Sequence, residues 1–368
     1  MPKAQETILE IDLKALKHNF EFIKSKLKSN TKCLAVVKAF AYGSDAVEIA
    51  KFLEDLDIDY FAVAYTNEGV TLRDAGITTP ILVLHPQENN FKTIIERCLE
   101  PSLYSHRILN AFIEVANVHK LKDYPVHIKF NTGLNRLGFV EKDIETIVSK
   151  LEKNISIKAE SLFSHLAASE DKGEIDFTSN QIISFKSIAN EVITRLDYKP
   201  ILHQCNTSGI INYPEAHFDM VRAGIGLYGF GNDPEVNKHL KPIATLKTII
   251  SQIHTLKTGE SLGYNRAFKA VKKTKTATLP IGHADGISRQ LGNGKGYVVI
   301  NNIKTPILGN VCMDMIMVDV TNINCEEGDE VIIFDSNYRA EELAETINSI
   351  SYELVTAVSQ RIKRTFNR

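Results

Sequence analysis

The sequence predicts an α/β protein in which a (β/α)8 barrel is followed by a mostly-β C-terminal domain. From about residue 30 to 225, short β-branched runs alternate with amphipathic helical stretches. After the turn-rich segment Gly231–Pro234, the chain becomes a series of short strands separated by glycine and asparagine turns. The length of 368 residues also exceeds what one core usually accommodates, because single cores stop growing near about 250–300 residues. We therefore expect a barrel over residues 1–234 and a β-rich domain over residues 235–368.

The expected barrel strands are eight apolar runs rich in β-branched residues: Lys32–Lys38, Tyr60–Ala64, Pro80–Leu84, Pro101–Ser105, Pro125–Phe130, Lys158–Ser164, Pro200–Cys205 and Asp219–Ala223. Helical segments, with apolar residues at three- and four-residue steps, lie between several of them: Asp45–Glu54, Arg107–His119, Glu141–Leu151 and Asp176–Leu196. Eight strand–helix units in roughly 200 residues are what a TIM barrel requires. A doubly wound open sheet is the competing architecture, and the number of units favours the barrel.

The second half is expected to form short strands, since its apolar runs end at turn residues: Thr245–Ile253, Thr274–Pro280, Gly296–Ile300, Pro306–Gly309, Met313–Val320 and Glu330–Phe334. One acidic stretch with a helical pattern, Ala340–Ser349, follows these strands. The second domain is therefore expected to be mostly β.

Composition excludes several classes of protein. The net charge of −2 gives no general attraction for nucleic acid or an anionic lipid surface, so we expect neither as a partner. Five cysteines are scattered without a Cys-x-x-Cys pair, which predicts reduced thiols and argues against disulfides and a metal site. The start has no apolar segment of signal-peptide length, and no apolar run is long enough to span a membrane. We expect a soluble, cytoplasmic protein.

Polar residues gather where the expected barrel strands end, which is where such barrels carry their chemistry. Lys38 ends the first strand and Lys129 the fifth, which continues into a glycine-flanked loop containing Arg136; His165 ends the sixth strand. A lysine closing an apolar run is costly to bury unless its pKa falls or it is used covalently. Taken singly, a solvent-reaching lysine and a core or capping histidine are the more common explanations.

Small hydroxyl residues and glycines follow the last two expected strands, in Asn206–Gly209 and in Arg222–Gly226. Backbone donors at this corner are the usual phosphate site of the fold, although ordinary turn chemistry explains them equally well on their own. A candidate Schiff-base lysine, a phosphate corner, and an arginine and a histidine between them point together to pyridoxal 5'-phosphate.

The chain resembles, almost from end to end, the alanine racemases that consist of a barrel and a β domain. The family's lysine motif reads Ala-Val-Val-Lys-Ala-Asn-Ala-Tyr-Gly-His-Gly, and residues 35–45 here read Ala-Val-Val-Lys-Ala-Phe-Ala-Tyr-Gly-Ser-Asp. Further matching stretches occur in the family's order: Phe61–Ala64, Leu72–Ile77, Asn131–Phe139, His203–Gly209, Asp219–Gly229 and Gly309–Asp314.

The resemblance implies a two-base racemisation of alanine. Lys38 carries the cofactor and serves as base or acid on the D-alanine face, and Tyr264, contributed by the partner subunit of a homodimer, serves the opposite face. Arg222 donates to the pyridine nitrogen and Arg136 to the phenolate oxygen. Because arginine does not readily give up its proton, it leaves the ring nitrogen unprotonated and disfavours transamination.

The resemblance also implies the binding residues. Those that hold the cofactor, mostly through its phosphate, are Tyr42, Asn206, Thr207, Gly224, Ile225 and Tyr352. His165 stacks on the cofactor ring and supports Tyr264, while Met313 and Asp314 line the substrate carboxylate site together with Arg136. Lys129 matches a lysine that is often carbamylated in the family and then braces Arg136.

Several positions depart from the family pattern: Phe40, Ser44, Asp45, Asn131, Ala223, Asn265 and His283. His283 stands where a tyrosine is usual near the substrate entrance, which keeps a serine or broad-specificity racemase as the alternative. An amino-acid decarboxylase is disfavoured, since those relatives carry an acidic residue where Arg222 stands. A cofactor carrier made of the barrel alone is disfavoured by the β domain. The expected function is interconversion of L- and D-alanine, supplying D-alanine for peptidoglycan.

Overall fold

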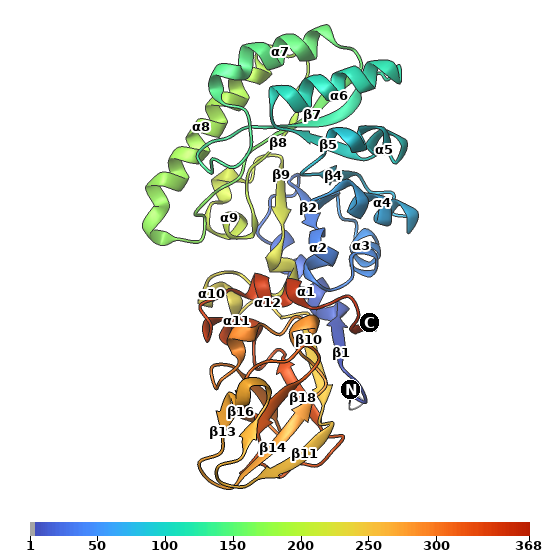
Figure 1. Cartoon of the computed structure of the whole chain (residues 1–368). Helices are drawn as coiled ribbons and strands as arrows, with labels where there is room; N and C mark the ends of the chain where they lie inside the picture. Colours follow the sequence, from blue (N-terminus) through green and yellow to red (C-terminus); the bar gives the residue numbers. More distant parts are fainter. Residues whose placement is uncertain (1–3) are drawn as a thin grey trace.

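The computed structural model describes residues 4–368 as a barrel joined to a sheet domain (Figure 1). Eight parallel strands close into the barrel in chain order, and β2 pairs with β9 to complete it. Their bounds are β2 Lys32–Val36, β3 Tyr60–Val63, β4 Ile81–Val83, β5 Glu100–Leu103, β6 Tyr124–Lys129, β7 Ile157–Phe163, β8 Ile201–His203 and β9 Met220–Ala223. Closure confirms the predicted (β/α)8 barrel and excludes the doubly wound open sheet.

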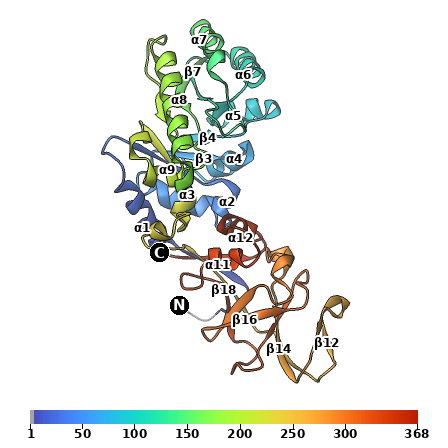
Figure 2. The same ribbon diagram turned by 90° about the vertical axis from the view of Figure 1, so that its left-hand side faces the viewer.

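Helices follow the barrel strands and cover them on the outside (Figures 1 and 2). They are α3 Ala46–Glu54, α4 Thr66–Asp74, α5 Phe91–Glu96, α6 His106–Val118, α7 Ile144–Lys153, α8 Ile175–Ile193 and α9 Thr207–Asn212. Side-chain caps fix several starts: Asp45 accepts from the amides of Val47 and Glu48, and Ser105 accepts from the amide of Ile108. The strands are buried on both faces, which explains their continuous apolar runs.

The C-terminal part is a nine-stranded sheet in the order β11-β14-β17-β16-β15-β18-β10-β1-β19. Its strands are β1 Ile8–Asp12, β10 Ala244–Ile249, β11 Gln252–Leu256, β14 Thr274–Leu279, β15 Tyr297–Ile300, β16 Ile303–Leu308, β17 Ile316–Asp319, β18 Glu330–Phe334 and β19 Lys363–Asn367. A separate hairpin joins β12 Ser261–Leu262 to β13 Phe268–Lys269. The predicted mostly-β C-terminal domain is confirmed.

The first strand of the chain belongs to this sheet rather than to the barrel. Strand β1 pairs antiparallel with β10 and parallel with β19, although residues 8–12 fall in the segment expected to form the barrel. Helix α1 (Leu13–Lys24) then leads into β2, with Asp12 capping its start. From β1 onward the chain leaves the sheet, completes the barrel and returns to the sheet, which connects the two parts.

Short helices lie between the barrel and the sheet: α10 Pro234–Asn237, α11 Ala340–Glu345 and α12 Ser351–Ala357 (Figure 1). The single predicted strand Thr245–Ile253 is two strands, β10 and β11, at separate places in the sheet. Within residues 4–368, no helix is long and apolar enough to cross a membrane.

Candidate active site

A cavity of about 360 Å³ opens at the carboxyl ends of the barrel strands, a size typical of small-molecule sites. Eleven sequence-predicted residues line it: Lys38, Tyr42, Lys129, Arg136, His165, Asn206, Thr207, Arg222, Gly224, Ile225 and Tyr352. All but Tyr352, which comes from α12, belong to the barrel part of the chain. No aspartate or glutamate is among the lining residues in the described part of the chain. The cavity is therefore suited to an anionic ligand.

Lys38 starts a left-handed turn, α2 (Lys38–Tyr42), directly after β2 rather than extending the strand. Residues 39–42 all have φ between 51° and 54°, a conformation that costs roughly 1–2 kcal/mol for each L-residue. The turn is held by its surroundings: Ala39 donates its amide to Glu68 at 2.6 Å, and Arg364 donates to the carbonyls of Gly43 and Ser44. This turn directs both Lys38 and Tyr42 into the cavity.

The corner formed by α9 and the segment after β9 is built around one hydroxyl. Thr207 Oγ1 accepts from the amides of Gly224 at 3.1 Å and Gly226 at 3.2 Å. A Cβ on Gly224 would lie 2.8 Å from the Tyr42 hydroxyl, so a side chain there would have to displace the phenol. Asn206 caps α9 by accepting from the Gly209 amide at 2.8 Å. Because Thr207 Oγ1 accepts from both amides, its own proton can be donated into the cavity, as can that of Tyr42, and a phosphate needs such donors.

Arg222, on β9, is fixed by buried acceptors on its neighbours. Its Nη1 lies 2.8 Å from His203 Nδ1, and its Nη2 lies 2.9 Å from His165 Nδ1. The same Nη2 donates to the carbonyls of Ser164 and Gln204. Both imidazoles must accept, since a guanidinium only donates. The arginine is thus locked in one orientation at the floor of the cavity.

Four cations, Lys38, Lys129, Arg136 and Arg222, crowd this cavity and lower the pKa values of its two lysines. Burial and then Arg136 lower the pKa of Lys38, and burial followed by Arg136, Arg222 and Lys38 lowers the pKa of Lys129 to about 8. The pKa of His165 falls well below its ordinary value, through burial first and Arg222 second. His165 is therefore neutral, and both lysines give up a proton more easily than in water.

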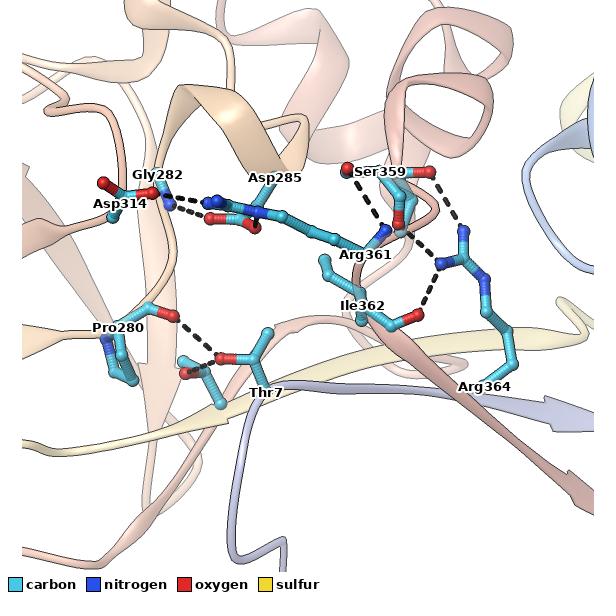
Figure 3. Close-up of polar contacts among 11 residues, drawn as sticks. Thr7, Pro280, Gly282, Asp285, Asp314, Ser359, Arg361, Ile362 and Arg364 are labelled. Atoms are coloured by element: carbon cyan, nitrogen blue, oxygen red, sulfur yellow. Dashed lines mark hydrogen bonds and ion pairs between the residues drawn. The ribbon is translucent and has the colours of Figure 1, made fainter.

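The remaining predicted site residues lie on the sheet domain and do not line this cavity. Tyr264 is 72% exposed in the turn between β12 and β13. Met313 and Asp314 lie in the loop before β17, where Arg361 bridges Asp314 and the buried Asp285 with two contacts of 2.7 Å (Figure 3). Arg361 thus links this loop to Asp285, although the side chains of Arg361 and Asp314 are about half exposed.

Seven further cavity residues were not predicted: Val36, Ala64, Tyr65, Leu84, His85, Leu137 and Phe163; an eighth, Ser208, lies in the predicted phosphate corner. Tyr65 and His85 follow closely on β3 and β4, and Phe163 is the last residue of β7. The rule that barrel chemistry gathers at the carboxyl ends of strands could have identified these three. The His85 ring contacts those of Tyr65 and Tyr104, with centroids 6.0 and 5.8 Å away.

Comparisons with known proteins agree with this architecture. Residues 11–232 match the family model "Alanine racemase, N-terminal domain", and residues 243–366 match "Alanine racemase, C-terminal domain". The chain belongs to the alanine racemase family. The alanine racemase of Methanococcus maripaludis is 36% identical over 97% of both chains. This chain is therefore an isomerase of the alanine racemase type.

Solved structures of alanine racemases superimpose on this one over nearly the whole chain. The enzyme of Clostridium difficile 630 gives a TM-score of 0.92 at 32% identity, covering 100% of this chain and 97% of that chain. The enzyme of Bartonella henselae, described with covalently bound pyridoxal phosphate, gives a TM-score of 0.89 at 27% identity, covering 99% and 100%.

The structure accounts for two of the departures from the alanine racemase pattern. Asn265 replaces a glycine at φ +58°, and asparagine is one of the few residues that tolerate this region. Asp45 caps α3, a role that glycine has no side chain to perform. His283 is exposed in the sheet domain and does not line the cavity.

Proposed function

We propose that the protein interconverts L- and D-alanine with pyridoxal 5'-phosphate in the cytoplasm, supplying D-alanine for peptidoglycan. The observation that carries the proposal is the cavity itself. It combines Lys38, a hydroxyl-and-amide corner and a locked arginine with no carboxylate among its lining residues. An anionic cofactor and an amino-acid carboxylate would supply the missing negative charge.

The residues present fit this cofactor. The Thr207 corner, with Tyr42 and Tyr352, would hold the phosphate, Arg222 would face the pyridine nitrogen and Arg136 the phenolate oxygen. Asn206 supports the corner as the cap of α9, and Gly224 and Ile225 contribute backbone. When bound, pyridoxal phosphate withdraws electrons from the α-carbon of an amino acid and makes its proton acidic.

Lys38 would remove or return the α-proton on the D-alanine face. Burial and Arg136 lower the pKa of its amine, which increases the neutral fraction that can act as a base near neutral pH. The left-handed turn fixes where this amine points. His165, neutral and hydrogen-bonded to Arg222, would lie against the cofactor ring and support the second base.

Tyr264 would be that second base, contributed by the partner subunit of a homodimer. It does not line the cavity of its own chain, yet it is 72% exposed on the sheet domain, where Met313 (58%) and Met315 (47%) are also exposed. Near the lysine turn, Phe40 (56%) and Tyr65 (59%) are also exposed. Two exposed apolar patches on one chain favour an isologous pairing in which each covers the other. Met313 and Asp314 would then meet the substrate carboxylate with Arg136.

Lys129 would carry a carbamate. A carbamate forms from a neutral amine and CO2 with loss of a proton, and a pKa of about 8 leaves a useful neutral fraction. The resulting anion would lie among Arg136, Arg222 and Lys38, whose positive charges it would offset.

Incubation with L-alanine in deuterated water tests the proposal. D-alanine should form with deuterium at its α-carbon, and L-serine run in parallel tests the broader alternative that His283 keeps open. Protein that binds the cofactor but forms no D-alanine would overturn the proposal.

A further inference from the structure

A continuous chain of hydrogen bonds crosses the inside of the barrel and ends on Arg222. We call it the imidazole relay, and its members are Tyr60, Glu100, His127, Ser161, His203 and Arg222. Each comes from a different strand. Strands β3 and β5 are not neighbours, and neither are β6 and β8, so their side chains meet through the barrel interior. Every member is at most 9% exposed.

The links of the relay are short. His203 Nδ1 lies 2.8 Å from Arg222 Nη1, and His203 Nε2 lies 2.9 Å from Ser161 Oγ. The same Oγ lies 2.6 Å from His127 Nδ1, and His127 Nε2 lies 2.7 Å from Glu100 Oε2. These distances are those of well-formed hydrogen bonds. The relay therefore joins an arginine at the cavity floor to a carboxylate at the start of β5.

The direction of the hydrogen bond between Arg222 and His203 follows from the chemistry of the guanidinium group. Guanidinium groups only donate, so His203 Nδ1 accepts from Arg222. Burial, and Arg222 after it, hold the pKa of His203 well below its ordinary value, so the ring is neutral and its single proton is on Nε2. That proton is donated to Ser161 Oγ. The ring also stacks on Phe163, with centroids 4.8 Å apart, which fixes its plane.

The same accounting continues to the carboxylate. With Ser161 accepting from His203, and with His127 carrying a single proton as His203 does, Ser161 donates its proton to His127 Nδ1 and His127 donates from Nε2 to Glu100. Tyr60 donates its hydroxyl to the same carboxylate oxygen at 3.0 Å, and burial, then Glu100, raise the pKa of this phenol. In this arrangement every proton between Arg222 and Glu100 points toward Glu100, whose carboxylate oxygen accepts.

We propose that Glu100 is a positioning residue, whose buried carboxylate fixes the donor direction of the relay so that His203 presents an unprotonated Nδ1 to Arg222. A charged group inside a barrel core is costly, and the proposed reaction leaves this carboxylate without another role. The guanidinium is thereby held for its contact with the pyridine nitrogen. Only this last link rests on the proposed function.

Three variants separate the relay from general core packing. Ser161→Ala cuts it in the middle, and Glu100→Gln removes its terminal charge. Tyr60→Phe is the matched control: it removes a hydroxyl donor from the same carboxylate but leaves all the links between Glu100 and Arg222. If Glu100→Gln fails to fold, Ser161→Ala decides the question, because it removes only one oxygen.

Imidazole ¹⁵N NMR of the protein without added cofactor reads the relay directly. In the wild type and in Tyr60→Phe, His203 and His127 should both be Nε2-protonated tautomers with slowly exchanging protons. In Ser161→Ala, the His203 Nε2 proton loses its acceptor, and its exchange with water should accelerate roughly tenfold or more. Protonation of His203 at Nδ1 or of His127 at both nitrogens in the wild type, or unchanged signals in Ser161→Ala, would overturn the proposal.

The second readout is the amount of pyruvate formed per D-alanine in the cofactor-loaded enzyme, since a loosened Arg222 allows more transamination. Ser161→Ala and Glu100→Gln should raise this ratio roughly tenfold with little change in KM for alanine, and Tyr60→Phe should not raise it. An unchanged ratio in both would contradict the link to Arg222. A wild type that shows the tautomers but no racemisation would refute the proposed function and leave the relay standing.

Discussion

Replacing Lys129 with methionine measures how far burial and the neighbouring positive charges of the cavity lower the free energy of unfolding. Lys129 is 7% exposed, and its pKa falls from 10.5 to about 8, through burial and then Arg136, Arg222 and Lys38. Each unit of pKa corresponds to about 1.4 kcal/mol, so protonated Lys129 destabilises the folded protein by roughly 3 kcal/mol. Methionine has a similar length and no charge.

The sign and the pH range follow from linkage. Below about pH 8, Lys129 is protonated in both the folded and the unfolded state, and the folded protein is destabilised by the full amount, roughly 3 kcal/mol. Between about pH 8 and 10.5 the unfolded state binds more protons, so wild-type stability rises by up to about 1.4 kcal/mol per pH unit relative to the variant. Lys129→Met should therefore be more stable than the wild type by roughly 2–3 kcal/mol at pH 7, and by much less at pH 10.

Urea denaturation of the cofactor-free protein in CO2-free buffer, followed by circular dichroism across this pH range, provides the assay. Lys153→Met is the matched control, because Lys153 is exposed at the end of α7. A stability difference independent of pH, or the same difference in the control, would refute the electrostatic reasoning. Added bicarbonate should stabilise the wild type and leave Lys129→Met unchanged if the amine takes up CO2, and intact mass should then rise by one carbamate.

Three further predictions follow from the geometry. Tyr264→Phe should bind cofactor normally but lose racemisation by at least about a hundredfold, while Lys38 still exchanges the α-proton of D-alanine in deuterated water; equal exchange of both enantiomers would contradict the assigned faces. Gly43→Ala should lower the melting temperature by an amount corresponding to more than about 2 kcal/mol, because its φ is +81° and a Cβ would lie 1.9 Å from the Val355 carbonyl oxygen. Thr207→Val should destabilise the cofactor-free protein by about 1–3 kcal/mol, since two backbone amides lose their acceptor, and inorganic phosphate should reduce this loss in thermal melts.

The barrel could be predicted because its strands are buried on both faces and appear as continuous apolar runs at regular spacing. Segments whose partners are distant in sequence could not. Strand β1 is five residues long and is stabilised by β10 and β19, more than 230 and 350 residues away, so no local pattern assigns it to the second sheet. The break between β10 and β11 is likewise set by their separate partners, β18 and β14.

The left-handed turn at Lys38 also lay outside sequence reasoning. Ala39, Phe40 and Ala41 have no intrinsic preference for positive φ, and the sequence predicts only that the strand ends at Lys38. The conformation is imposed by contacts from elsewhere, with Glu68 accepting from one end and Arg364 donating to the other.

By itself, the sequence determined the barrel, the β-rich second part and the residue types at the strand ends. These features follow from the hydrophobic pattern and side-chain types within short stretches of the chain. Only the tertiary structure decided which of these residues share one cavity, how the neighbouring cations lower the pKa values of Lys38 and Lys129, and how a carboxylate at the start of β5 connects to Arg222. Those properties depend on distances between strands far apart in the chain. Such distances are fixed only once the barrel closes.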